Sequence, residues 1–308
     1  MALMTYAEAS RSSLRAAMLA QPDVVVVGED VGRGGIFQQY KGLQQEFGAQ
    51  RVIDTPISEA TILGAGVGMA LAGLKPVVEM RVIDFALCAM DEIVNQAAKA
   101  RFMFGGQGRV PLVARMPIGL WSGSAAQHSQ SLEAWFAHVP GLVVVTPATP
   151  QDNYSLLRAA IDCGDPVIYM EHKELWGLQS DVRDEVLPLG KAKVVREGKD
   201  VTLVTWSRTV HAALEAKTSK SVEIIDLRTL WPWDRETVFS SVRKTGKLLV
   251  VHEAVQAAGF GAEIAATVAE ELKVPVKRLG APRIPVGYSK PLEDEARMTA
   301  QKIAALLE

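Results

Sequence analysis

Three segments carry side chains whose types suit proton transfer beside a flat ring. Glu59 closes the run Thr55–Glu59, just after a proline bend and at the predicted first turn of a helix. Asp84 and Phe85 follow an apolar strand, and His128 ends a loop of small residues. Carboxylates and imidazoles move protons near neutral pH, and an aromatic side chain can stack on a planar ring. These residues are the candidates for chemistry.

Each candidate also has a purely structural interpretation. Ser58 is a good N-cap residue, and Glu59 behind it would complement the positive end of the helix dipole. His128 precedes a helix predicted to start at Ser129, which would favour a neutral imidazole, but it could equally cap the loop. Phe85 could be a core residue. The local sequence leaves both interpretations open for all three.

The elements around these residues alternate between strands and helices. The first part has short apolar strands, separated by amphipathic helices: the strands are 24–27, 77–80, 110–114, 142–145 and 167–170, and the helices are 58–72, 90–104, 129–137 and 151–162. The alternation resumes after a charged, irregular stretch. This pattern predicts two doubly wound α/β domains, residues 1–177 and a smaller one at 199–308, joined by a linker at 178–198. In such folds, ligands bind at the carboxyl ends of the parallel strands, and Phe85 follows the end of the strand predicted at 77–80.

The glycines at 64, 66 and 68 do not form a dinucleotide fingerprint. Their spacing is not G-x-G-x-x-G, and they lie inside a predicted helix rather than in a strand-to-helix turn. Because glycine costs about 1 kcal/mol against alanine in a helix, three of them suggest that another backbone or a ligand comes close. The sequence has no Walker A motif.

Composition excludes several classes of function. The 308 residues carry a formal net charge of −2, so nothing indicates a nucleic-acid partner. No apolar run approaches the ~20 residues that span a bilayer, and the first residues do not resemble a signal peptide. Cys88 and Cys163 lack metal-ligand spacing. We expect a cytoplasmic protein with reduced cysteines and no membrane association.

Many short motifs in order resemble one enzyme family along the whole chain. They include Val27–Asp30, Arg51–Glu59, Ala126–Gln130, His138–Leu142 and His252–Glu253. Together they resemble the beta subunit of the thiamine-diphosphate-dependent component of 2-oxo acid and acetoin dehydrogenases, a transketolase-like family. The resemblance implies a pyrimidine-binding domain followed by a transketolase C-terminal domain.

The resemblance also implies roles for particular residues. Glu59 matches the glutamate that hydrogen-bonds N1′ of the cofactor's aminopyrimidine, and Phe85 matches the aromatic residue against that ring. Ile57 falls among the cofactor-binding residues, and His128 matches a histidine that handles protons and the substrate or lipoyl group. A further set falls where family members can hold a structural potassium ion, largely through backbone carbonyls: Leu112, Ala160, Ile161, Cys163 and Asp165.

A thiamine-diphosphate enzyme also needs a Gly-Asp-Gly segment for Mg²⁺ and the diphosphate, and this sequence has none. The resemblance therefore implies an alpha subunit that supplies that half, an α2β2 heterotetramer, and a lipoyl acyltransferase core as acyl acceptor. Pyruvate, branched-chain 2-oxo acids and acetoin all remain open as substrates. The alternatives are the C-terminal half of a split transketolase acting on sugar phosphates and a non-catalytic scaffold. Gln127–Gln130 and Glu171–Lys173 favour the dehydrogenase, and Glu59, Phe85 and His128 together argue against a scaffold.

Overall fold

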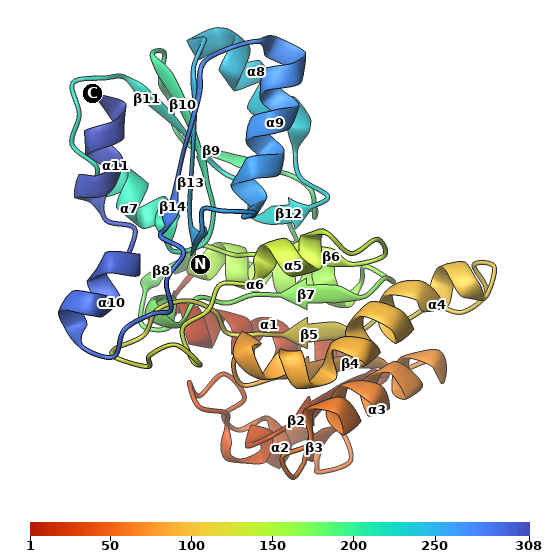
Figure 1. The fold of residues 1–308 in the computed structure, drawn as a ribbon. Coiled ribbons are helices and arrows are strands. Elements are labelled where there is room, and N and C mark those ends of the chain that lie inside the picture. The colour runs from red at the N-terminus through yellow and green to blue at the C-terminus, as the bar shows by residue number, and fades with distance from the viewer.

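The computed structural model describes residues 1–308 and contains two large sheets (Figure 1). The first has seven strands in the order β12-β6-β7-β5-β4-β2-β3, parallel except for β12. Its strands are β2 (Val24–Gly28), β3 (Val52–Asp54), β4 (Lys75–Glu79), β5 (Val113–Arg115), β6 (Val143–Val145), β7 (Val167–Tyr169) and β12 (Thr229–Trp231). The expected doubly wound α/β fold is confirmed.

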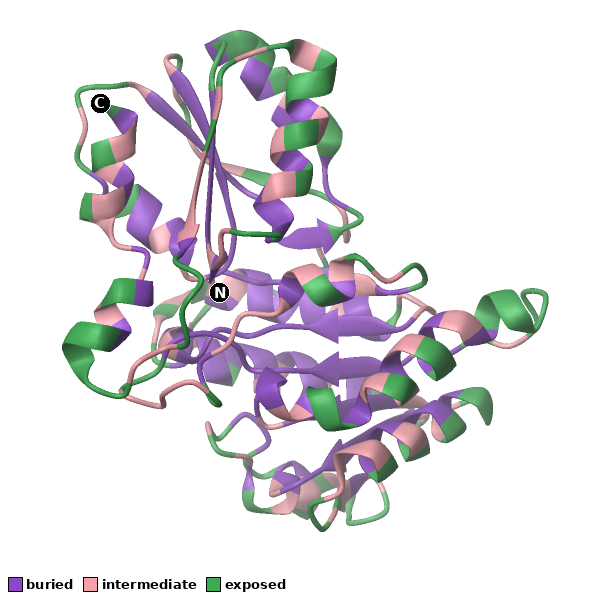
Figure 2. Cartoon of the chain, in the orientation of Figure 1, coloured by how far each residue is buried: buried purple, intermediate pink, exposed green.

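Alternating side chains along β2 show why both faces of this sheet are covered. Val24 and Val26 point into a core shared with α1 (Tyr6–Ala20) and α6 (Pro150–Ile161). Val27 points the other way, into a core shared with α3 (Glu59–Leu71) and α4 (Ala98–Met103). A strand buried on both faces reads as a continuous apolar run in the sequence, as β2 does, and Figure 2 shows the strands of this sheet as buried.

The second sheet has five strands in the order β14-β13-β10-β11-β9, and only β9 is antiparallel. Helices cover both of its faces, with α7 and α11 on one side and α8 and α9 on the other (Figure 1). The strands are β9 (Lys193–Arg196), β10 (Val201–Thr205), β11 (Val222–Asp226), β13 (Leu248–Val255) and β14 (Val276–Ala281). The helices are α7 (Thr209–Glu215), α8 (Arg235–Thr245), α9 (Phe260–Leu272), α10 (Lys290–Ala296) and α11 (Ala300–Leu307).

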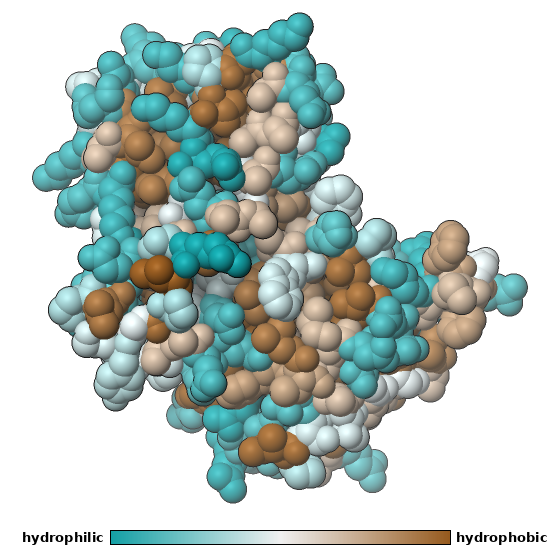
Figure 3. Space-filling view, in the orientation of Figure 1, coloured by the Kyte–Doolittle hydropathy of each residue, from teal (hydrophilic) through white to brown (hydrophobic).

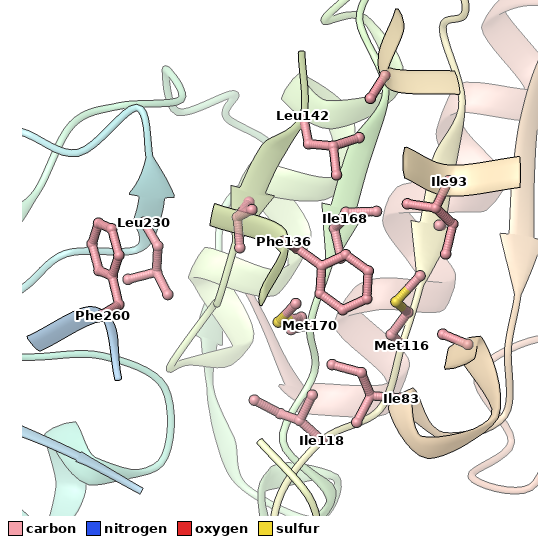
Figure 4. Packing of buried hydrophobic residues seen from close by; sticks show 14 of the residues in the cluster. Ile83, Ile93, Met116, Ile118, Phe136, Leu142, Ile168, Met170, Leu230 and Phe260 are labelled. Carbon is pink, nitrogen blue, oxygen red and sulfur yellow. The ribbon is translucent and has the colours of Figure 1, made fainter. Parts of the chain in front are cut away.

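The two sheets are joined by a continuous apolar core. The largest buried cluster has 37 residues and draws on both halves of the chain, with Phe136 and Ile168 from the first half and Leu230 and Phe260 from the second (Figure 4). In addition, β12 comes from the second half of the chain and pairs antiparallel with β6, an edge that the sequence analysis did not foresee. The halves therefore pack with a core-like interface.

The stretch 178–198 differs from the linker we expected. It begins with β8 (Gln179–Val182), which pairs antiparallel with β1 (Ala2–Thr5), and ends with β9 in the second sheet. The residues between these two strands, 183–192, lack regular structure. The charged composition that suggested a linker reflects the exposed, short character of these edge strands.

Two helices also differ from expectation. Residues 129–132 are not helical, and α5 spans only Glu133–Ala137. The helix expected at 90–104 has a π-helical turn at Glu92–Ala97 before α4. The other elements named from the sequence lie within a few residues of their observed ends. None of the helices has the length and apolar character required to cross a membrane.

Of the three helical glycines, only Gly66 confirms the expected close approach. A Cβ there would lie 2.8 Å from Val78 Cγ2 and 2.9 Å from Leu112 Cδ1, because α3 packs directly on β4 and the residues before β5. A Cβ on Gly68 would meet nothing within 4 Å, and one on Gly64 would make only an ordinary contact with Glu92. The packing interpretation is therefore wrong for Gly64 and Gly68 within this chain.

Candidate active site

Glu59 is the first residue of α3, at the carboxyl edge of the first sheet. It is half-buried and has no hydrogen-bond or ion-pair partner within the chain. Ser58 precedes the helix as expected, but its hydroxyl donates to Thr61 Oγ1 at 2.8 Å and does not cap the backbone. The helix start thus presents a carboxylate free to accept a hydrogen bond from elsewhere.

A second carboxylate, which the sequence analysis did not single out, lies near Glu59. Glu29 directly follows β2, the strand between β3 and β4, and is buried. Burial raises the pKa of Glu29, Arg81 opposes this shift, and the negative charge of Glu59 adds to it. Arg81 Nη1 lies 3.5 Å from Glu29 and 2.7 Å from Asp30, so one cation holds both side chains.

Phe85 and His128 are in contact. Their rings are 5.2 Å apart between centroids and nearly perpendicular, at 86°. Phe85 lies on a 3₁₀ segment (Ile83–Ala89) after β4, half-buried, and His128 is exposed. Both rings therefore remain partly accessible at the same edge of the sheet as Glu59.

The segment 119–130, here called the His128 loop, is held without a helix. Gln130 Nε2 donates to Asp84 Oδ1 at 2.7 Å, and the Gly119 amide donates to the Gln130 carbonyl at 3.0 Å. These bonds draw the chain back towards the strands, and helical structure starts only at Glu133. The dipole argument for a neutral His128 is therefore wrong, because a helix dipole acts only within its first turn.

The structure thus brings Phe85 and His128 together and places Glu59 along the same edge, with Glu29 on the strand between. Ile57 is 75% exposed in the bend before α3. The edge offers an unpaired carboxylate, an aromatic face and an imidazole. This donor set fits one end of a planar, nitrogen-containing ring, with Glu59 as hydrogen-bond acceptor.

The five residues expected near potassium lie at the opposite end of the strands. The Leu112 carbonyl accepts the Val167 amide at 2.8 Å, and the Ala160 carbonyl accepts the Cys163 amide at 3.2 Å. The carboxylate of Asp165 is bound by Arg101 Nη1 at 2.5 and 2.7 Å. Burial raises the pKa of Cys163, so its thiol stays protonated at neutral pH. These residues, Ile161 included, take no part in the edge that carries Glu59.

Comparison with known proteins identifies both domains of the chain. The family model "Transketolase, pyrimidine binding domain" matches residues 2–179, and "Transketolase, C-terminal domain" matches residues 190–303. A solved structure titled "Split gene transketolase, inactive beta4 tetramer" has a TM-score of 0.80 at 22% identity, covering 99% of this chain and 97% of that one. The fold and its edge site thus define a two-domain protein of the transketolase type.

Curated relatives of this chain include beta subunits of dehydrogenases and of an acetoin oxidoreductase. The Arabidopsis thaliana "Pyruvate dehydrogenase E1 component subunit beta-1, mitochondrial" is 45% identical over 94% of this chain and 84% of its own length. The Bacillus subtilis "2-oxoisovalerate dehydrogenase subunit beta" is 40% identical over 100% and 98%. The Cupriavidus necator "Acetoin:2,6-dichlorophenolindophenol oxidoreductase subunit beta" is 43% identical over 94% and 91%. The chain belongs to this family of dehydrogenase beta subunits.

Proposed function

We propose that the chain is the beta subunit of a thiamine-diphosphate-dependent dehydrogenase acting on a 2-oxo acid or acetoin. The observation that carries the proposal is the unpartnered Glu59 carboxylate at the sheet edge that also presents Phe85 and His128. When bound, the cofactor would supply an electron sink for cleavage of a carbon–carbon bond beside a carbonyl. The relatives' names support this reaction class.

The chain's own residues would bind, orient and handle protons. Glu59 would accept the hydrogen bond of a ring nitrogen, and the buried carboxyl of Glu29 would lie nearby. Phe85 would pack against the ring, and Ile57, exposed in the same bend, would line its entrance. The exposed His128 would hold a proton and orient the substrate or the lipoyl acceptor.

The remaining parts of the enzyme would come from partners. Without a Gly-Asp-Gly segment, the chain would depend on an alpha subunit for Mg²⁺ and the diphosphate, in an α2β2 assembly that passes acyl groups to a lipoyl acyltransferase core. Exposed apolar side chains at the end of α4, Phe102, Met103 and Phe104, offer a contact surface (Figure 3). The carbonyls near Leu112 and Ala160 would bind K⁺. A cytoplasmic location is also part of this proposal.

Titration calorimetry and co-expression test the proposal. Thiamine diphosphate should bind only when a matching alpha subunit is present, and the assembled complex should turn over pyruvate, a branched-chain 2-oxo acid or acetoin. If the cofactor binds with none of the alpha subunits, the proposal is wrong and the chain is instead a non-catalytic scaffold. Activity on sugar phosphates without transfer to lipoyl groups would instead favour the split transketolase.

A further inference from the structure

We propose that Lys173 is a positioning residue, which holds the backbone of His128 in place so that the imidazole stays against Phe85. The functional part of this inference rests on the role proposed above for His128. The structural part, control of the His128 loop by one buried ammonium, does not.

Lys173 lies in the 3₁₀ turn Lys173–Leu175, after β7, and is only 2% exposed. Its Nζ donates a hydrogen bond to the main-chain carbonyl of His128. No carboxylate lies within 4.0 Å of this ammonium, so an ion pair does not account for its burial. Buried lysines are rare unless paired. The hydrogen bond to His128 is therefore the specific contact that places this side chain.

Four carboxylates from four elements surround Lys173 at longer range. Asp84 comes from the Phe85 segment, Glu174 from the same turn, Glu253 from β13 and Glu293 from α10. Burial lowers the pKa of Lys173 to about 8, and the four negative charges only partly oppose this shift. The ammonium charge therefore starts to be lost in the slightly alkaline range. The same Asp84 accepts Gln130, so both ends of the His128–Gln130 segment depend on this cluster.

The second half of the chain holds the other end of the His128 loop. Glu253 Oε1 accepts the Leu120 amide at 2.9 Å and contacts His172 Nε2 at 2.8 Å. Glu293 Oε1 accepts the Gly123 amide at 3.0 Å. Carboxylates of β13 and α10 thus hold the start of the loop, and Lys173 holds it at His128. Among the side chains of the protein, Lys173 alone bonds the residue that carries the imidazole.

The first test measures the loop itself, in the full chain and in the assembled complex. Lys173→Met keeps the length of the side chain and removes the donor. Hydrogen–deuterium exchange of residues 119–130 should rise at least about fivefold, while α8 stays protected. Lys173→Arg should restore most of the protection, and Lys217→Met, at an exposed lysine, should change nothing. Unchanged exchange in a folded Lys173→Met chain would overturn the proposal.

The second test separates positioning from general damage. In the complex, Lys173→Met should slow acylation of a lipoyl domain at least about tenfold, but reduction of 2,6-dichlorophenolindophenol less than about threefold. The wild-type acylation rate should fall as pH rises through about 8, and Lys173→Arg should move that fall to higher pH. Equal losses in both reactions would overturn the positioning role. A wild-type complex inactive on all substrates would refute the proposed function instead, and the exchange result would still decide on Lys173.

Discussion

The carboxylate of Glu59 is available to a ligand because it has no partner within the chain. Neighbouring charged groups along this edge, such as Asp30 and Arg81, form ion pairs, whereas its carboxylate has none. A group without internal partners can be changed at little cost to folding.

We therefore expect Glu59→Gln to keep the free energy of unfolding within about 0.5 kcal/mol of wild type. Turnover of the complex should fall by about 10²-fold or more, because an amide cannot take up the proton that the role proposed for this carboxylate requires. Exchange of the cofactor's C2 proton, followed by NMR, is the measurement. Near-normal exchange of the C2 proton would show that Glu59 has no role in the reaction. The control is Glu46→Gln, on the surface at α2 (Leu43–Phe47).

His128 is exposed and contributes little to the core, so its replacement should affect activity rather than folding. His128→Ala should lower the rate of lipoyl acylation by about 10²-fold, in the range typical of a group that transfers protons. Stopped-flow acylation of an isolated lipoyl domain measures this step. An unchanged rate would reduce the residue to a role in loop structure.

Local sequence signals singled out Glu59, Phe85 and His128 as candidates but did not indicate the side chains around them. Glu29 stands in the quoted motif Val27–Asp30, and its place after a buried strand was the available signal. Lys173 stands in the quoted segment Glu171–Lys173, but nothing in that segment indicated its burial, which depends on packing between β7, the His128 loop and the second sheet. Contacts between segments so distant in sequence cannot be read from either segment alone.

Helix α3 contains a matched pair of glycines at the scale of one element. Gly66→Ala would place a Cβ under 3.0 Å from Val78 and Leu112, whereas Gly68→Ala meets open space. We expect Gly66→Ala to destabilise the chain by about 1–3 kcal/mol through overpacking. Gly68→Ala should stabilise it by about 0.5–1 kcal/mol through helix propensity. Urea unfolding of the two variants checks this, and equal effects would contradict the packing described for α3.

Elements with strong end signals were predicted well. Helix α6 was predicted at 151–162 and spans Pro150–Ile161, since Thr149 caps its start and Pro150 occupies its first turn. The start of α5 was misplaced because Ser129 looks like a cap, yet its segment is held by Gln130 and Asp84 instead. Strand β12 was missed because three residues after a tight turn give no periodic pattern.

At the scale of the whole molecule, the junction between the two sheets contains a titrating carboxyl. Asp226, at the end of β11, is 1% exposed, and Arg228 Nη2 pairs with Asp152 of α6 at 2.6 Å. Burial, together with the charge of Asp152, raises the pKa of Asp226 to about 8 although Arg228 opposes it.

Because the folded state raises this pKa, the unfolded chain releases the proton first, and stability falls as pH rises from about 4 to 8. The expected slope is on the order of 1 kcal/mol per pH unit. Asp226→Asn cannot ionise, so its stability should vary less over this range and exceed wild type at pH 9. Denaturant titrations from pH 5 to 9 measure the difference. Parallel pH profiles for the two proteins would show that Asp226 does not ionise on unfolding.

The pairing of β12 with β6 determines how the chain can be divided. A fragment that stops in residues 183–192 would contain nearly all of the first sheet, yet β6 would become its outer strand. Its apolar residues Val143–Val145 would then present unpaired amides and carbonyls to other molecules. Such a fragment should self-associate, so the boundary seen in the sequence is not a safe place to cut the protein.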